Sequence, residues 1–382
     1  MSAARIANRG GALMRLRGMV RKETLQILRD PSSISIAFVM PVVLLLLFGY
    51  GVSLDAKHIP LAFVIEQPDA ASESFAAAFR QSEYFNPRRF GSIQEAEQAM
   101  AERRVDGIVW LRGDFERRLL GRGDAPVGVI LNGVDANQAR IAQGYIQGAW
   151  QSWLHAYAAA QGQELKVPVA AEHRVWFNPA LRSRNFLVPG LVAVIMTLIG
   201  ALLTALVVAR EWERGTMEAL MVTPIRIREI LLGKLLPYFV LGMGGMLLSV
   251  AMALWQFEVP LRGSFWLLLA ASAVFMLVAL GMGLLISTVA RNQFVAGQIA
   301  ILVTFLPAFI LSGFIFDIGS MPVPVQVITH LVPARYFVAI LQTLFLAGDV
   351  WPVVLGNAAA LLAMMLIFFT ILRRKARKDL EP

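Results

Sequence analysis

Long apolar runs separated by short polar stretches dominate the chain. Six runs of 21 to 27 residues contain no Asp, Glu, Lys or Arg: 34–54, 186–209, 235–257, 264–290, 294–316 and 350–372. A helix needs about 20 residues to cross ~30 Å of hydrocarbon. The pattern therefore predicts six membrane-spanning helices. A single large soluble core is the weaker interpretation, because soluble cores rarely supply uncharged segments of this length.

The segment 55–185, between the first two runs, follows a different pattern. Short apolar stretches typical of buried strands alternate with amphipathic, helix-like stretches. This alternation favours a small α/β domain and leaves the strand order open. The predicted fold class is an α-helical membrane protein with six transmembrane helices and an α/β extracytoplasmic domain inserted between spans 1 and 2. In that domain, strands are expected at 61–65, 107–111, 127–131 and 174–177, and helices at 72–84, 92–104 and 135–161.

Composition agrees with a membrane protein and removes several kinds of site. Of the 382 residues, 57% are hydrophobic and only 16% are charged, against about 25% charged in soluble proteins. The mean hydropathy is +0.62. The chain has no cysteine, which excludes disulfides and thiolate metal sites, and its four histidines lack the spacing of a metal-ligand pair. No catalytic residue, resident metal or cofactor is therefore expected.

The basic residues predict the orientation in the membrane. Eighteen Lys and Arg fall on one side of the predicted spans, in 1–33, in 210–234, at Arg291 and in the basic tail 373–382. The segments on the other side, 258–263 and the predicted outer loop or re-entrant segment 317–349, carry one each. Basic residues mark the cytoplasmic side of a membrane protein, so both termini are expected in the cytoplasm.

The position of the basic residues along the chain also indicates which kind of partner the net positive charge suits. The inserted domain holds 15 basic and 15 acidic residues, so the net charge of +9 belongs to the segments beside the membrane. Such residues face anionic lipid, and nucleic-acid binding is not expected.

The N-terminal segment 1–33 contains an amphipathic stretch before the first span. From Leu13 to Asp30, basic residues keep away from an apolar side formed by Leu13, Leu16, Val20 and Ile27. A helix of this kind is expected to lie along the cytoplasmic membrane surface and to end at Pro31. The apolar run that follows is too long for a cleavable signal peptide, so it is expected to remain as an anchor.

The loop 210–234 is longer than two antiparallel spans need. Its first part predicts a charged exit from the membrane and then a short amphipathic helix with Met217, Leu220 and Met221 on one face. An exposed apolar face of this kind suggests a docking surface. The polar positions of this part are Arg210, Glu211, Glu213, Arg214 and Glu218. The alternative interpretation is that these charges only set the orientation of the spans in the membrane.

Two further positions suit the ends of these elements. Gly215 is expected to let the chain bend between the membrane exit and the docking helix, because glycine tolerates unusual φ angles. Thr223 and Pro224 fit a helix cap followed by proline in the first helical position, which would start the helix that returns to the membrane.

The loop resembles the cytoplasmic loop of ABC-2 type transporter permeases, the membrane subunits of ATP-binding-cassette exporters. The resemblance rests on the run Arg210-Glu211-Trp212-Glu213-Arg214-Gly215-Thr216 and continues through Pro224 and Gly233-Lys234. The large insert after the first span is similar to that of the bacterial drug-efflux subgroup, which implies a location in the inner membrane of a bacterial cell. Less specific matches are Lys22-Glu23, Arg29-Asp30-Pro31, 176–179, 182–190 and 332–336.

The resemblance implies a permease that hydrolyses no ATP itself. ATP and Mg²⁺ would bind to an ATPase partner present in two copies, and the chain contains no Gly-x-x-x-x-Gly-Lys-Ser/Thr phosphate loop. A second permease subunit, identical or different, completes the expected assembly, and a periplasmic adaptor of the membrane-fusion type is left open. The segment 13–30 becomes an interfacial connecting helix. Coupling to the ATPase is assigned to Arg210, Glu211, Glu213, Arg214, Gly215, Met217, Glu218, Leu220, Met221, Thr223 and Pro224.

The expected substrates are lipophilic or amphipathic compounds, drugs or lipids, moved out of the cytoplasm or the inner leaflet. The uncharged spans offer scattered hydroxyls and amides, and the candidates for a translocation path are Thr197, Thr204, Gln298, Thr304 and Ser312. For any one of them, a hydrogen bond to a neighbouring helix is the simpler interpretation. Two other functions remain: an ion-driven secondary transporter, which uncharged spans disfavour, and a membrane sensor or scaffold with a ligand-binding outer domain.

Overall fold

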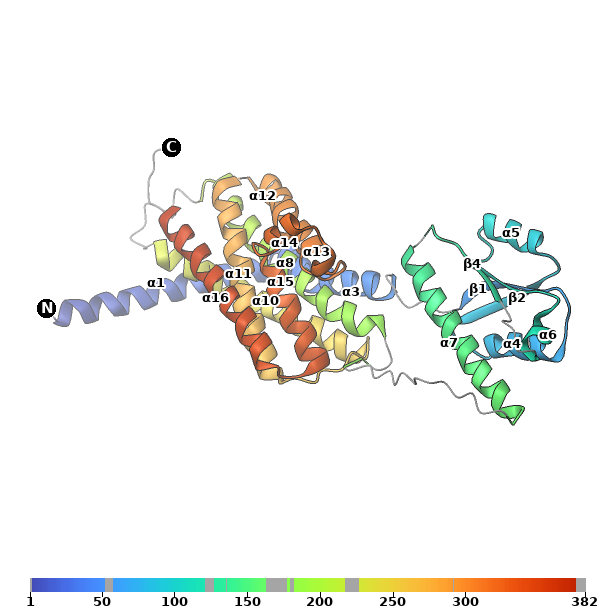
Figure 1. Cartoon of the computed structure of the whole chain (residues 1–382). Coiled ribbons are helices and arrows are strands. Elements are labelled where there is room, and N and C mark those ends of the chain that lie inside the picture. The colour runs from blue at the N-terminus through green and yellow to red at the C-terminus, as the bar shows by residue number, and fades with distance from the viewer. Residues whose placement is uncertain are drawn as a thin grey trace. The chain divides into compact units, whose positions relative to one another are not determined.

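The computed structural model divides the chain into two compact units (Figure 1). One unit comprises Met1–Val52 and Val175–Pro382, and the other comprises Ser53–Arg174. The structure describes residues 2–51, 58–120, 127–134, 136–162, 177–178, 182–216, 227–290 and 292–375.

The first unit contains six helical segments that are long and apolar enough to cross a membrane, within the described residues. The expected number of spans is therefore found. They are Pro31–Gly51, which joins α2 (Pro31–Ile34), the π-helical turn η1 (Ser35–Val39) and α3 (Met40–Gly51); α8 (Ser183–Glu213); Glu229–Trp255 in α10 (Ile227–Trp255); α11 (Phe265–Ala290); Gln293–Leu311, which joins α12 (Gln293–Ala300), the π-helical turn η2 (Ile301–Phe305) and α13 (Leu306–Leu311); and Trp351–Arg374 in α16 (Trp351–Lys375).

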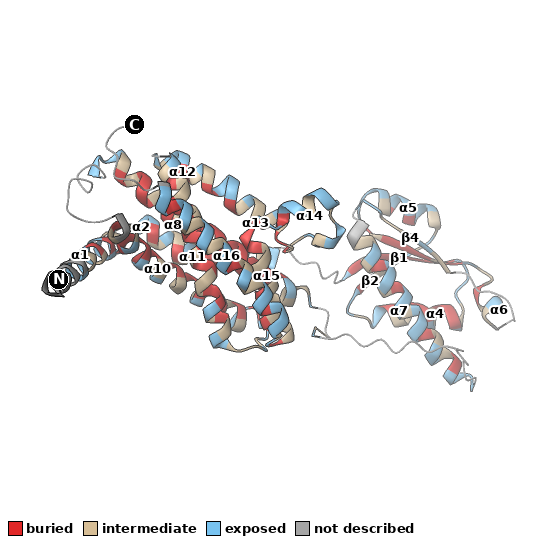
Figure 2. Cartoon of the chain, turned by 60° about the vertical axis from the view of Figure 1, so that its left-hand side comes forward, coloured by how far each residue is buried: buried red, intermediate tan, exposed pale blue. Residues whose placement is uncertain are grey.

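The helix α8 forms the centre of this unit (Figure 2). In its most apolar window 89% of the residues are buried, against 11% in α16 and 22% in the span that contains α12 and α13. The side chains of Val192, Met196 and Ile199 on α8 are fully enclosed. Because α8 touches most of the other spans, any displacement of this helix must repack the core.

Close contact between α8 and α11 depends on small residues. A Cβ atom at Gly283 of α11 would overlap the Ala201 carbonyl and the Thr204 hydroxyl of α8. The Thr204 hydroxyl donates to the carbonyl of Leu280 at 2.8 Å, and the Ser287 hydroxyl donates to Ala205. These contacts pair polar groups inside an otherwise apolar interface, as is usual for membrane helices.

The segment 317–349, predicted as an outer loop or re-entrant segment, is mostly helical. It contains a 3-10 turn η3 (Ile318–Ser320), α14 (Val323–Thr329), α15 (Pro333–Gln342) and the π-helical turn η4 (Thr343–Ala347). The two helical parts Val323–Thr329 and Pro333–Ala347 meet at an angle of 85°, which fits a re-entrant segment or a broken span.

The N-terminal helix α1 (Ser2–Leu28) begins earlier than the amphipathic stretch predicted from Leu13. It ends before Pro31, as expected, because proline cannot continue the preceding helix. Asp30 then caps α2: its carboxylate accepts from the Ser32 backbone N–H at 3.3 Å and from the Ser33 hydroxyl at 2.7 Å. A cap between α1 and α2 allows the chain to change direction at the start of the first span.

The second unit is an α/β domain built on one four-stranded sheet. The strands follow the order β2-β1-β3-β4, with β1 parallel to β2 and β3 and with β4 antiparallel to β3. The helices α4, α6 and α7 cover one face and α5 covers the other, as Figure 1 shows. The elements are β1 (Ile59–Ile65), α4 (Ala70–Arg80), β2 (Phe85–Phe90), α5 (Ile93–Ala101), β3 (Gly107–Leu111), α6 (Phe115–Leu120), β4 (Val127–Leu131) and α7 (Ala136–Ala160).

Most predicted elements of this domain are present, and two were missed. The strands predicted at 107–111 and 127–131 coincide with β3 and β4, and α5 begins with the Ser92 hydroxyl accepting from the Glu95 backbone N–H. Sequence analysis missed β2 and α6. β2 is an edge strand that contains Pro87 and two arginines, a composition that hides its strand character. The strand predicted at 174–177 lies almost wholly outside the described residues.

Candidate functional site

The coupling segment predicted from the sequence begins as a continuation of α8. The helix runs unbroken from the membrane to Glu213, and Arg214 and Gly215 close it. Gly215 has a φ of +65°, a left-handed conformation that favours glycine at a helix end. This is the bend expected at that position. The charged residues Arg210, Glu211 and Glu213 therefore share a rigid helix with the centre of the transmembrane core.

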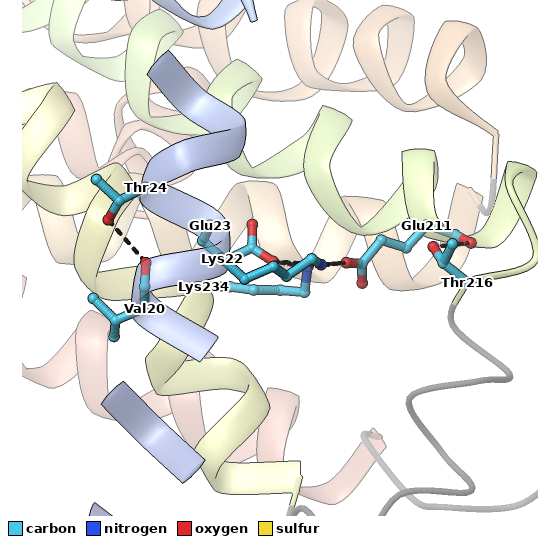
Figure 3. A network of polar contacts seen from close by, with 7 residues as sticks. All are labelled: Val20, Lys22, Glu23, Thr24, Glu211, Thr216 and Lys234. Carbon is cyan, nitrogen blue, oxygen red and sulfur yellow. Dashed lines mark hydrogen bonds and ion pairs between the residues drawn. The ribbon is translucent and has the colours of Figure 1, made fainter. Parts of the chain in front are cut away.

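Beside this helix end, four charged side chains from three helices form a closed cluster, which we call the charge quartet: Lys22 and Glu23 of α1, Glu211 of α8 and Lys234 of α10 (Figure 3). The Lys22 ammonium lies 3.0 Å from Oε1 of Glu23 and 2.8 Å from Oε1 of Glu211. The Lys234 ammonium contacts the same two oxygens, at 3.1 Å and 2.8 Å. Each ammonium group thus bridges both carboxylates.

Because the quartet is largely buried, its positive and negative charges have to balance. The side chains of Glu23, Glu211 and Lys234 are 0%, 4% and 1% exposed, whereas Lys22 is 45% exposed. Removing an ion from water costs several kcal/mol, and only close opposite charges compensate for it. Two cations and two anions make the quartet neutral. The loss of any one member would leave a net charge buried among apolar residues.

Two further ion pairs attach α1 to the same helices. The Arg15 guanidinium makes a two-pronged contact with Glu229 of α10, at 3.0 Å and 2.9 Å. Near the other end of α1, Arg210 donates to the Asp30 carboxylate at 2.7 Å. Burial raises the pKa of Asp30, but hydrogen bonds from Ser32, Arg210 and Ser33 outweigh it and hold that pKa well below its usual range. Asp30 is therefore ionised and paired at physiological pH.

Close packing between α1 and α10 completes the attachment. A Cβ atom at Gly233 would lie 2.5 Å from Cγ of Met19, so only glycine lets the two helices approach this closely. Glu23 sits on the same buried side of α1, between Met19 and Ile27, which are each 5% exposed. The helix α1 is thus fixed to those ends of α8 and α10 that flank the loop 210–234.

The structure corrects one expectation about this loop. Glu211 was expected to pair with a charge on a partner protein, but its carboxylate is buried and bonded to Lys22 and Lys234 of its own chain. Arg210 is likewise paired internally, and Glu213 accepts from the backbone N–H and side-chain amide of Gln293. Arg214 and Gly215 are exposed. The remaining predicted coupling residues lie outside the described part of the chain: Met217, Glu218, Leu220, Met221, Thr223 and Pro224.

The candidate translocation residues have structural partners where the structure describes them. The hydroxyls of Thr197, Thr204 and Thr304 are buried and each donates to the backbone carbonyl four residues earlier. Ser312 is buried, and its hydroxyl has no hydrogen-bond partner among the described residues. Gln298 is exposed on α12. In this conformation, three of the five groups thus serve helix structure, and the path itself stays a prediction.

Sequence analysis had missed Glu23 and Lys234 as site residues. Their signal is visible afterwards: Met19, Glu23 and Ile27 follow each other at four-residue spacing, so an acid interrupts an apolar helix side. Lys234 stands directly before an apolar run, where a cation needs a partner. The two signals belong to segments more than 200 residues apart, and periodicity alone cannot pair them.

Comparison with known proteins places these features in a family context. Residues 31–373 match the family model described as ABC-2 family transporter protein. The chain is 45% identical to the "Probable multidrug ABC transporter permease YbhS" of Escherichia coli, over 96% of this chain and 98% of that protein. It is 29% identical to the "Probable multidrug ABC transporter permease YbhR" of the same organism, over 90% and 95% of the two chains. It is 22% identical to the "Linearmycin resistance permease protein LnrN" of Bacillus subtilis, over 90% and 94%.

The charge quartet predicts a specific pattern of stability. Lys234→Met should destabilise the purified protein by roughly 3–5 kcal/mol, because it leaves a buried negative charge uncompensated. The double variant Glu23→Gln with Lys234→Met keeps a neutral pair, Lys22 with Glu211, and should melt closer to the wild type. Arg17→Met, on the exposed side of α1, is the control and should change little. Thermal unfolding in detergent measures all four proteins; equal melting of Lys234→Met and Arg17→Met would contradict the assignment.

Proposed function

The chain belongs to the ABC-2 family of transporter proteins, and on that basis we propose that it is the permease subunit of an ATP-driven exporter. The family match covers residues 31–373, and relatives similar over almost their whole length are named multidrug ABC transporter permeases. The chain is a multi-pass membrane protein of this family. ATP hydrolysis then takes place on a separate ATPase subunit, with the termini and the loop 210–234 facing it in the cytoplasm.

The observation that carries the coupling proposal is the charge quartet. The loop joins the end of α8 to the start of α10, and Glu211 and Lys234 lie close to these two ends. Both are bonded to α1 through Glu23 and Lys22. A partner that moves the loop would therefore displace α1, α8 and α10 together. Since α8 is the buried centre of the spans, this displacement would reach the whole transmembrane core.

Ion-driven transport remains the second candidate, and the structure offers it little support. Such transporters use titratable groups near the middle of the membrane. The buried charges described here lie instead at the helix ends next to α1, where they form a neutral cluster in which each charge contacts opposite charges. This position suits mechanical coupling to a cytoplasmic partner better than passage of an ion.

The proposed assembly contains two permeases and two ATPase subunits. In three spans fewer than a third of the residues in the most apolar window are buried within the unit, namely Pro31–Gly51, Gln293–Leu311 and α16, which leaves room for lipid and for a second permease. Native mass spectrometry of the wild-type complex should show two copies of each subunit. Glu218→Arg should lose the ATPase subunits, because Glu218 belongs to the residues of the loop that are assigned to coupling, whereas Arg373→Glu in the tail should keep them. An intact assembly with one permease, or an unchanged Glu218→Arg complex, would contradict this arrangement.

The proposed substrates are lipophilic or amphipathic compounds. The six apolar runs that form most of each span carry no charge, and the relatives' names refer to several drugs or to linearmycin resistance. A cell that lacks this permease should become several-fold more sensitive to some amphipathic drugs, and plasmid-borne wild-type protein should restore resistance. A growth screen that shows unchanged sensitivity to all such drugs, together with a defect for a polar solute, would assign a different substrate class.

The coupling role predicts separable effects on ATP hydrolysis. The double variant Lys22→Gln with Glu211→Gln keeps the quartet neutral through the remaining pair of Lys234 and Glu23, so it should fold and assemble with the ATPase. Substrate-stimulated ATP hydrolysis should nevertheless fall about tenfold, a loss within the usual range of coupling energies between sites. Basal hydrolysis should stay near that of the wild type. Full stimulation in a correctly assembled double variant would show that the quartet does not transmit the signal.

A further inference from the structure

A strongly basic cavity lies between α1 and the end of α8. Its volume is about 670 Å³, which is within the ~300–1,000 Å³ typical of small-ligand sites. Six charged residues line it: Arg21, Lys22, Arg29, Asp30, Arg210 and Arg214. Five are cations and one is an anion, so the cavity has an excess of four positive charges.

The cations divide into two groups. Lys22 belongs to the charge quartet and Arg210 is paired with Asp30, so the charges of both are compensated within the chain. Within the described part of the chain, the side chains of Arg21 and Arg29 form no hydrogen bond or ion pair. The Arg214 side chain forms no ion pair there either, although it interacts electrostatically with the preceding residue, Glu213. Three guanidinium groups therefore face one cavity with their hydrogen-bond donors available to an anion.

The cavity lies at the level where the membrane begins. On α1, the residues that line the cavity end at Asp30, directly before the first span starts at Pro31. On α8, which forms the second span, they are Arg210 and Arg214 at the end of the helix. Leu25 lines the same cavity and is 43% exposed, and Leu28, one turn further along α1, is 66% exposed. Phosphate-binding groups and exposed leucines on one helix surface match the boundary between lipid headgroups and acyl chains.

We propose that this cavity binds the phosphate group of an anionic phospholipid from the cytoplasmic leaflet. Arg21, Arg29 and Arg214 would hold the phosphate, while Leu25 and Leu28 contact the start of an acyl chain. Basic pockets at the cytoplasmic ends of membrane helices are suited to such headgroups. The bound lipid would bridge α1 and the end of α8, next to the charge quartet. The binding proposal rests on the charge-based orientation and can be tested without any ATPase or transported compound.

An acidic surface of the ATPase partner is the competing occupant. The exposed leucines favour the lipid, because they lie at the start of the membrane span and a phospholipid supplies both an anion and hydrocarbon there. A protein surface in the same place would have to bury Leu28 at the depth of the headgroups. The two occupants make different predictions for the permease purified by itself.

The test compares lipid binding by full-length permease in dodecyl maltoside micelles, measured by native mass spectrometry. Dioleoyl phosphatidylglycerol is the anionic probe and dioleoyl phosphatidylcholine is the neutral control. Arg21→Gln with Arg29→Gln should weaken phosphatidylglycerol binding roughly 25-fold, since each basic residue near an anionic lipid contributes about a fivefold gain in affinity. Arg373→Gln with Arg374→Gln removes the same charge from the cytoplasmic end of α16, away from the cavity, and should cause less than about a twofold change.

Each other outcome would overturn the proposal. Equal weakening in the two double variants would mean that only general positive charge attracts the lipid. Displacement of phosphatidylglycerol by millimolar sn-glycerol 3-phosphate would reveal a site for free anions. Unchanged lipid binding in Arg21→Gln with Arg29→Gln, together with loss of ATPase co-purification, would identify a protein-docking cavity. Matching melting temperatures establish that both variants are folded, and Arg214→Gln provides an independent single substitution with an expected fivefold loss.

Discussion

The high cost of burying charge governs how α1, α8 and α10 are held together beside the loop 210–234. Glu23, Glu211 and Lys234 are almost completely enclosed, and an ion in such surroundings needs an opposite charge in direct contact. The quartet meets this requirement only when α1, α8 and α10 are together, because each helix contributes at least one member and no helix contributes a balanced set of buried charges. Separating any of the three helices would leave an unpaired ion in an apolar environment. The three helix segments therefore behave as one mechanical body.

This constraint connects the surface helix to the membrane core. Arg15 with Glu229, and Asp30 with Arg210, extend the same attachment along α1, while Gly233 permits direct contact with Met19. The loop 210–234 connects α8 and α10 covalently. The same two helix ends are also held together by their noncovalent contacts with α1. Because α8 continues without a break into the centre of the spans, the helix ends around the quartet and the transmembrane core share one rigid element. The proposed coupling to an ATPase subunit requires such an element.

Sequence patterns predicted the elements well and their partnerships poorly. The uncharged runs located all six spans, and alternating patterns located β3, β4 and α7, since burial dictates residue type at each position. The edge strand β2 was missed because Pro87 and two consecutive arginines interrupt its apolar pattern. The bend at Gly215 was predicted from glycine's backbone freedom. Glu211, by contrast, was expected to be exposed and to contact another protein. A charged residue at the end of a membrane span is usually solvated, and the sequence alone does not reveal that Lys22 and Lys234 lie beside Glu211.

The most direct test of the account is a distance measurement across the proposed rigid body. The chain has no cysteine, so Arg17→Cys on α1 and Leu232→Cys on α10, both exposed, provide two unique sites for spin labels. Pulsed electron paramagnetic resonance of the assembled transporter should give the same narrow distance distribution without nucleotide and with ATP and vanadate. The distribution should broaden when Lys234→Met breaks the quartet. A distance that changes between the two nucleotide states while the quartet is intact would show that α1 moves independently of α10 and would contradict the account.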